Sequence, residues 1–191
     1  MPSYEYNMPE LHQYEFEQFR AFVEEAYRDS IRGNIRPAPM EITTATMDLD
    51  DLPRNYAGVG HKHKRHNYVG FAWNGTGKMW VKPGRPDFDM KRTTIHELSH
   101  LRVNVESHGP KFRRVFGVAL AMYMWRLGKD WSEIRREISA LVYRYRHYRA
   151  WTPQGRFNNY RDYQDRCFEE IETIFKAAQR VCGYSNTLYR R

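Results

Sequence analysis

The sequence predicts an α+β fold with one small sheet, and three observations lead to this class. A helical segment, a strand-like segment and a hairpin are followed along the chain by further helices. The chain has 191 residues and a hydrophobic fraction of 41%, which is enough to bury a core and too apolar for a disordered protein. No apolar run approaches the ~20 residues that span a bilayer, so we expect no membrane partner.

The first half of the chain carries the N-terminal helix and the predicted strands. Residues 9–31 place apolar side chains on one helical face, and Gly33 is a typical helix stop. Residues 40–47 alternate between apolar and polar as a half-buried strand does. The runs 67–73 and 77–84 flank the turn sequence NGTG, which predicts a hairpin.

Two helices are predicted next, separated by a short bend. Asp87 or Asp89 is expected to cap a helix over residues 90–105. The following helix should begin with Pro110 in its first position and stop at Gly128.

The last quarter of the chain is also predicted to be helical. Asp130 and Glu133 have the spacing of a capping box, which predicts a helix over residues 131–149. A final helix is expected over residues 159–182, with its stop at Gly183.

Charge is distributed unevenly along the chain, whose net charge is +8. Acidic side chains dominate residues 1–30, and basic ones dominate residues 141–191. We divide the chain into a core, residues 1–128, and a helical, basic and aromatic extension, residues 129–191, packed on or beside it. A basic surface of this kind favours a polyanionic partner such as nucleic acid.

The two cysteines and the N-terminal residues bear on the compartment. Cys167 and Cys182 are too few for a disulfide framework or a cysteine zinc ribbon. The first residues have neither the basic nor the apolar region of a signal peptide. We therefore expect a cytoplasmic protein, or a virion-associated one if a phage encodes it.

The sequence HELSH at residues 96–100 has the spacing of a metal site. His96 and His100 are four residues apart, so on a helix both rings stand on one face and can reach one Zn²⁺ at ~2.0–2.1 Å. Glu97 lies ~100° round the helix, from where it can reach a zinc-bound water. Metal-assisted hydrolysis needs these roles, since zinc acidifies the water and a carboxylate removes its proton.

A catalytic zinc needs a third protein ligand and one open position. His108 is our candidate for that ligand, because Gly109 and Pro110 suit a bend that would return the chain to the metal. The alternative carboxylate ligands are Glu106, Glu133 and Glu137. The alternative to any metal site is an amphipathic helix with solvent-facing histidines and an apolar face of Ile95, Leu98, Leu101 and Val105.

HELSH followed by HGPKF at residues 108–112 resembles the SprT-like zincins, the family of the Spartan protease of DNA–protein crosslink repair. The resemblance implies a zinc metallopeptidase with His96, His100 and His108 as ligands and Glu97 as the catalytic base. It also implies a zincin-like order of N-terminal helix, small sheet with hairpin, active-site helix and C-terminal helices.

The resemblance extends from the first helix through Gly128, but its specific part is the motif. The spacing from His100 to His108 is short for the family, and the family's frequent cysteine zinc ribbon is absent. In that architecture an edge strand binds the substrate as an added strand, and residues 77–84 would supply it, although an ordinary hairpin strand is the alternative.

Two basic segments are candidate nucleic-acid contacts. The sequence HKHKRH at residues 61–66 suits phosphate contact, a solvated loop or a further metal site. The sequence YRYRHYRAW at residues 143–151 interleaves arginine with aromatic rings, which suits either base stacking or a helix that packs its rings. The candidate residues are Lys62, Lys64, Arg65, Arg144, Arg146 and Arg149.

The hypothesis from sequence is a zinc metallopeptidase that cleaves a protein or peptide substrate. The alternatives are hydrolysis of a non-peptide amide, and a non-catalytic zincin-scaffold protein with a structural or nucleic-acid-binding role, such as a phage assembly component. Tyr68, Tyr123 or an arginine would stabilise the oxyanion of a catalysed reaction.

Overall fold

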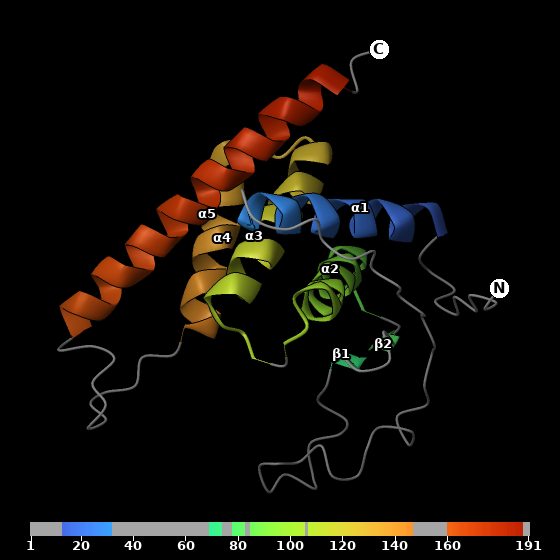
Figure 1. The fold of residues 1–191 in the computed structure, drawn as a ribbon, viewed down its shortest axis with the longest axis horizontal. Coiled ribbons are helices and arrows are strands. Elements are labelled where there is room, and N and C mark those ends of the chain that lie inside the picture. Colours follow the sequence, from blue (N-terminus) through green and yellow to red (C-terminus); the bar gives the residue numbers. More distant parts are fainter. Residues whose placement is uncertain are drawn as a thin grey trace, which may run out of the picture. The chain divides into compact units, whose positions relative to one another are not determined.

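The computed structural model describes residues 13–31, 69–73, 78–82, 85–105, 107–146 and 160–188, and these are mostly helical (Figure 1). The chain folds as two compact units, one of Met1–Arg20 with Ala38–Glu106 and one of Ala21–Pro37 with Ser107–Arg191. The division into residues 1–128 and 129–191 stays a prediction. None of the described helices is long and apolar enough to cross a membrane.

The predicted α+β, zincin-like class is wrong for this chain. Within the described ranges the β-structure is one hairpin, β1 (Gly70–Trp73) and β2 (Lys78–Val81), and helices form most of the remainder. Strands of four residues cannot make a layer of their own and depend on a helix for burial. The strand predicted at 40–47 lies outside the described residues.

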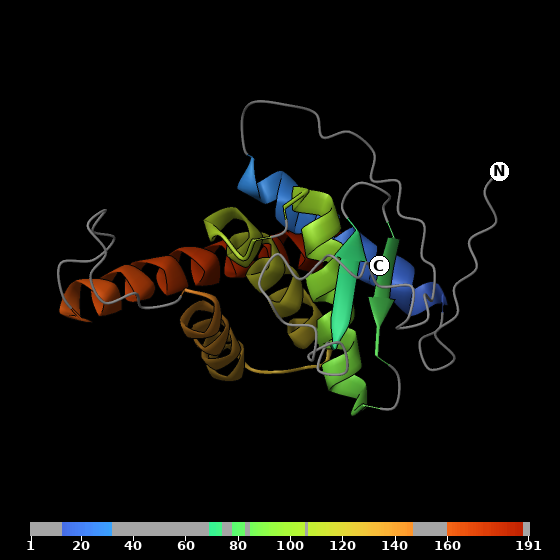
Figure 2. The same cartoon turned by 90° about the horizontal axis from the view of Figure 1, so that it is seen from below.

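The first unit pairs the hairpin with α2 (Asp87–Val103), as Figure 2 shows. The two strands are antiparallel with Gly70 opposite Val81, so the predicted hairpin is confirmed. Apolar side chains of both strands and of α2 are buried: Phe71, Met79, Val81, Ile95 and Leu98. The hairpin therefore lies against the helix that carries the HELSH motif.

The ends of α2 differ from the prediction. Its N-cap residue is Pro86, without a side-chain hydrogen bond, so the caps predicted at Asp87 and Asp89 are wrong. At the other end, Asn104 takes a left-handed conformation with φ of 56°, and its amide donates to the carbonyl of His100. Val105, predicted on the apolar face of the helix, lies beyond this end.

The second unit is built on α3 (Pro110–Arg126), α4 (Trp131–Tyr145) and α5 (Tyr160–Leu188), together with the C-terminal half of α1 (Gln13–Ser30). The three later helices pack on one another (Figure 1). A Cβ on Gly117 of α3 would lie 2.7 Å from Ile174 Cγ2 of α5, so the glycine permits their close approach.

Most of the predicted helix ends in this unit are confirmed. Pro110 occupies the first turn of α3, and Gly128, with φ of 76°, follows its end. Asp130 and Glu133 form the predicted capping box of α4. The predicted stop at Gly183 is wrong, because α5 continues past it to Leu188. One helical glycine costs only ~1 kcal/mol relative to alanine, and the burial of neighbouring apolar side chains on α5 outweighs that.

Candidate metal centre

His96 and His100 face each other on α2. Their Nε2 atoms are 3.1 Å apart, and the ring centroids are separated by 4.8 Å. Two nitrogen ligands at ~2.0–2.1 Å from a tetrahedral zinc would be ~3.3 Å apart. Ring nitrogens this close share either a proton or a bound cation, so the pair fits two ligands of one metal ion.

A backbone carbonyl fixes the orientation of the His100 ring. Its Nδ1 lies 2.8 Å from the carbonyl oxygen of Val105, and a carbonyl only accepts, so Nδ1 donates and Nε2 presents its lone pair to His96. Burial lowers the pKa of His100, and the bond to Val105 acts in the opposite direction. Burial therefore favours the neutral, metal-binding form of the ring.

His108 lies among aromatic rings at the start of α3. Its ring stacks on Tyr145 with a centroid distance of 4.3 Å and an angle of 13°, and it meets Phe112 edge-on at 4.9 Å. The ligand atoms of His96, His100 and His108 all lie within 4.8 Å of one another. These three histidines can hold a metal ion, and imidazole nitrogens suit zinc among several transition metals.

Glu97 is buried beside the histidine pair, with 5% of its surface exposed. Its Oε1 lies 4.0 Å from His96 Nε2. Burial raises the pKa of Glu97 to about 8. A cation bound nearby would favour the carboxylate and lower this pKa, so the group can change its protonation state at neutral pH.

Gly70 of β1 makes room for this carboxylate. A Cβ at this position would lie 2.6 Å from Glu97 Oε1 and 2.5 Å from Thr93 Cγ2, so any side chain would displace α2 groups. Sequence reasoning missed Gly70, although a glycine inside a strand is a signal of close approach. It also missed Val105, whose carbonyl becomes a ring partner only through the turn at Asn104.

The other candidates are placed as follows. Arg144 is exposed on α4, whereas Arg146 forms an ion pair with Glu170. Glu133 belongs to the capping box and pairs with Lys129. The metal-binding group found within the described ranges includes neither Glu133 nor Glu137, and Tyr123 is buried on α3. The remaining candidates lie outside the described residues: Lys62, Lys64, Arg65, Tyr68, Glu106 and Arg149.

The resemblance noted in the sequence rests on residues 96–100 and 108–112 and stays a prediction. No protein-family model, no curated protein and no solved structure matches this chain.

Proposed function

We propose that this chain is a zinc-dependent hydrolase that cleaves peptide bonds, with Glu97 as its general base. The observation that carries the proposal is the buried Glu97 carboxylate 4.0 Å from His96 Nε2, next to a histidine pair with 3.1 Å between its ring nitrogens. A titratable group shifted by burial beside potential metal ligands is typical of a catalytic site.

His96, His100 and His108 are the residues that would hold the metal. A bound zinc would supply a positive charge that polarises the scissile carbonyl and acidifies a water molecule. Metal binding through Nε2 of His100 needs the tautomer with its proton on Nδ1. The carbonyl of Val105 favours this tautomer, because it accepts a hydrogen bond from Nδ1–H.

Glu97 performs the proton transfers. As a carboxylate it accepts a proton from the attacking water, and as a carboxylic acid it donates that proton to the departing amine nitrogen. Burial raises its pKa to about 8, and the charge of a bound cation acts in the opposite direction. A base that must both take and give a proton works best when these opposing effects leave its pKa near the working pH.

The experiment compares zinc content and peptide hydrolysis in the wild type and in Glu97→Gln. We expect both proteins to bind about one zinc, measured by elemental mass spectrometry, since Glu97 is not assigned as a ligand. Cleavage of an unfolded protein substrate should fall by ~10²–10⁴-fold in the variant. The matched control is Asp89→Asn on the same helix, whose carboxylate pairs with Arg85 at the surface and should leave cleavage unchanged.

Two outcomes would overturn the proposal. Cleavage at the wild-type rate by zinc-loaded Glu97→Gln would remove Glu97 from the reaction. A wild-type chain that binds zinc and cleaves neither unfolded proteins nor peptides would assign the three histidines to a structural site.

A further inference from the structure

Arg113 connects the backbone of His108 to α5. Its side chain is buried in the first turn of α3, and it donates from Nη1 to the carbonyl oxygen of His108 at 2.7 Å. Its Nε and Nη2 donate to the two carboxylate oxygens of Glu170 at 2.6 and 3.0 Å. One guanidinium thus uses a two-bond contact with a carboxylate to hold the peptide group of a candidate ligand.

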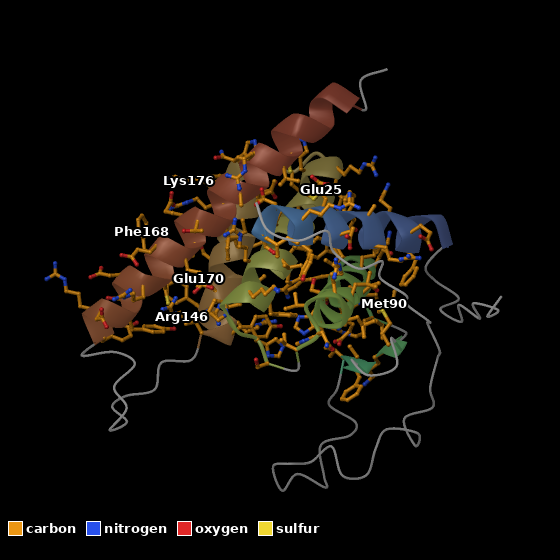
Figure 3. All side chains as sticks on the ribbon, viewed as in Figure 1. Glu25, Met90, Arg146, Phe168, Glu170 and Lys176 are labelled. Atoms are coloured by element: carbon orange, nitrogen blue, oxygen red, sulfur yellow. The ribbon has the colours of Figure 1, made fainter. Side chains whose placement is uncertain are left out.

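Glu170 also connects to the ring of His108, through the end of α4. Its Oε2 pairs with Arg146, the C-cap residue of that helix, and Figure 3 shows the two side chains together between α4 and α5. The carbonyl of Arg146 in turn accepts a hydrogen bond from the Tyr163 hydroxyl at 2.8 Å. Tyr145, the preceding residue, stacks its ring on that of His108.

A carboxylate between two largely buried guanidiniums joins the helices at a high desolvation cost. Desolvation of the three charged groups offsets much of their attraction, and apolar side chains of similar volume would hold α3, α4 and α5 at least as well. The three charged groups do what apolar ones could not, because they fix the direction of a carbonyl and of a helix end beside His108.

We propose that Glu170, Arg113 and Arg146 are positioning residues that set the metal affinity of His108. Glu170 acts on the His108 peptide through Arg113 and on the His108 ring through Arg146 and Tyr145. This inference rests on the metal site of the proposed function, with His108 as a ligand, but not on peptide cleavage. It gives Arg146 a role inside the fold, where the sequence had predicted a nucleic-acid contact.

The test measures zinc affinity by competition with a chromophoric chelator. Glu170→Gln keeps the size of the side chain but loses the charge that holds two guanidiniums, and we expect its affinity to fall by about tenfold, as for other partners of metal ligands. The matched control is Glu172→Gln, which breaks an ion pair with Arg135 between α4 and α5. Its affinity should stay within about twofold of wild type.

A second pair of proteins separates positioning from general weakening. In a His108→Ala background, Glu170→Gln should cause no further loss of zinc affinity, because its route to the metal has been removed. An equal loss in both backgrounds, or wild-type affinity in Glu170→Gln alone, would overturn the inference. If Glu170→Gln does not fold, Arg113→Lys replaces it as the test variant. Lysine keeps the positive charge but lacks the planar fork of arginine, so we expect its zinc affinity to fall as well. Unchanged zinc affinity in Arg113→Lys would also overturn the inference.

Failure of this inference differs from failure of the proposed function. Zinc affinity that depends on Glu170 in a chain that never cleaves peptides would leave the inference standing and remove the peptidase. A chain that cleaves peptides and whose zinc affinity is the same in Glu170→Gln as in the wild type would overturn the inference and leave the proposed function standing. A wild-type chain that binds no zinc would overturn both.

Discussion

Glu97 on α2 and Glu170 on α5 are both largely buried carboxylates, but their surroundings differ. Glu170 lies between the guanidiniums of Arg113 and Arg146, each within hydrogen-bonding distance. Glu97 lies against the backbone of Gly70 and 4.0 Å from the ring of His96, and burial raises its pKa to about 8. The first carboxylate is held by fixed charges, while the second keeps a proton that it can exchange.

This difference separates the bundle of α3, α4 and α5 from α2, the helix that carries the HELSH motif. In the bundle a buried charge is compensated, so removing its partner should destabilise the protein. On α2 a buried charge is disfavoured until a cation arrives, so removing the charge should stabilise the metal-free protein. Perturbed groups of the second kind are the ones expected at a functional site.

The largest expected effect comes from breaking the compensated charges. Arg113→Met should lower the free energy of unfolding by about 3–5 kcal/mol, because it takes one of two guanidiniums from a largely buried carboxylate and one hydrogen bond from the His108 carbonyl. Urea denaturation at neutral pH measures the loss. Arg135→Met, at a pair whose arginine is 43% exposed, should cost less than about 1 kcal/mol and serves as the control. Equal losses in the two variants would contradict the comparison.

The next effect tests the space around Glu97. Gly70→Ala places a Cβ where Thr93 Cγ2 and Glu97 Oε1 now lie, and we expect a loss of about 1–3 kcal/mol in the free energy of unfolding. Peptide cleavage should fall as well, while zinc content stays near wild type, because the side chains that a Cβ at Gly70 would meet first are Thr93 and Glu97 and not the candidate ligands. Thermal denaturation and a cleavage assay on the same preparation check both. Wild-type behaviour in both assays would show that α2 adjusts freely.

The sequence predicted features that depend on neighbours along the chain. The hairpin pairing of β1 and β2, Pro110 at the start of α3 and the capping box of Asp130 and Glu133 were all recognisable, because each is decided by a short stretch of sequence. The spacing of His96 and His100 also follows from one turn of helix. The fold class could not be predicted in the same way, since short apolar runs do not say whether strands will join into a larger sheet.

The surroundings of the site depend on contacts between distant residues. Arg113 and Glu170 are 57 positions apart, and no local pattern indicates that they pair. Arg146 looked like a phosphate contact because arginines among aromatic rings fit both a nucleic-acid surface and a packed helix end. The elevated pKa of Glu97 arises from burial, which the motif alone does not reveal.

A smaller effect concerns the pH dependence of the metal-free protein. The pKa of Glu97 is about 8 in the folded chain against an ordinary value of 4.5, so the folded state binds more protons between these values and stability falls as pH rises. The lowered pKa of His100 removes stability only as pH falls below 6.5. Between pH 6.5 and 8, Glu97 should therefore account for a loss of about 1–2 kcal/mol in the free energy of unfolding.

Urea denaturation in the presence of a chelator measures this slope, and Glu97→Gln isolates it. The free energy of unfolding of the variant should change less with pH than that of the wild type. Between pH 6.5 and 8, the variant should be more stable than the wild type by the largest amount at pH 8. Parallel profiles for the two proteins would contradict the assignment of the raised pKa to Glu97.

The smallest expected effect comes from a glycine-to-alanine substitution on α5, which should change the free energy of unfolding in the opposite direction from Gly70→Ala. Gly183 is exposed within α5, and a Cβ there would meet nothing within 4 Å. Gly183→Ala should raise the free energy of unfolding by about 0.5–1 kcal/mol, because alanine loses less backbone entropy in a helix. Thermal denaturation beside Gly70→Ala gives the comparison directly. A loss of stability in Gly183→Ala would mean that α5 does not run as a helix through this position. Opposite signs at the two glycines would assign the cost at Gly70 to the Thr93 and Glu97 side chains that its Cβ would meet, rather than to alanine itself.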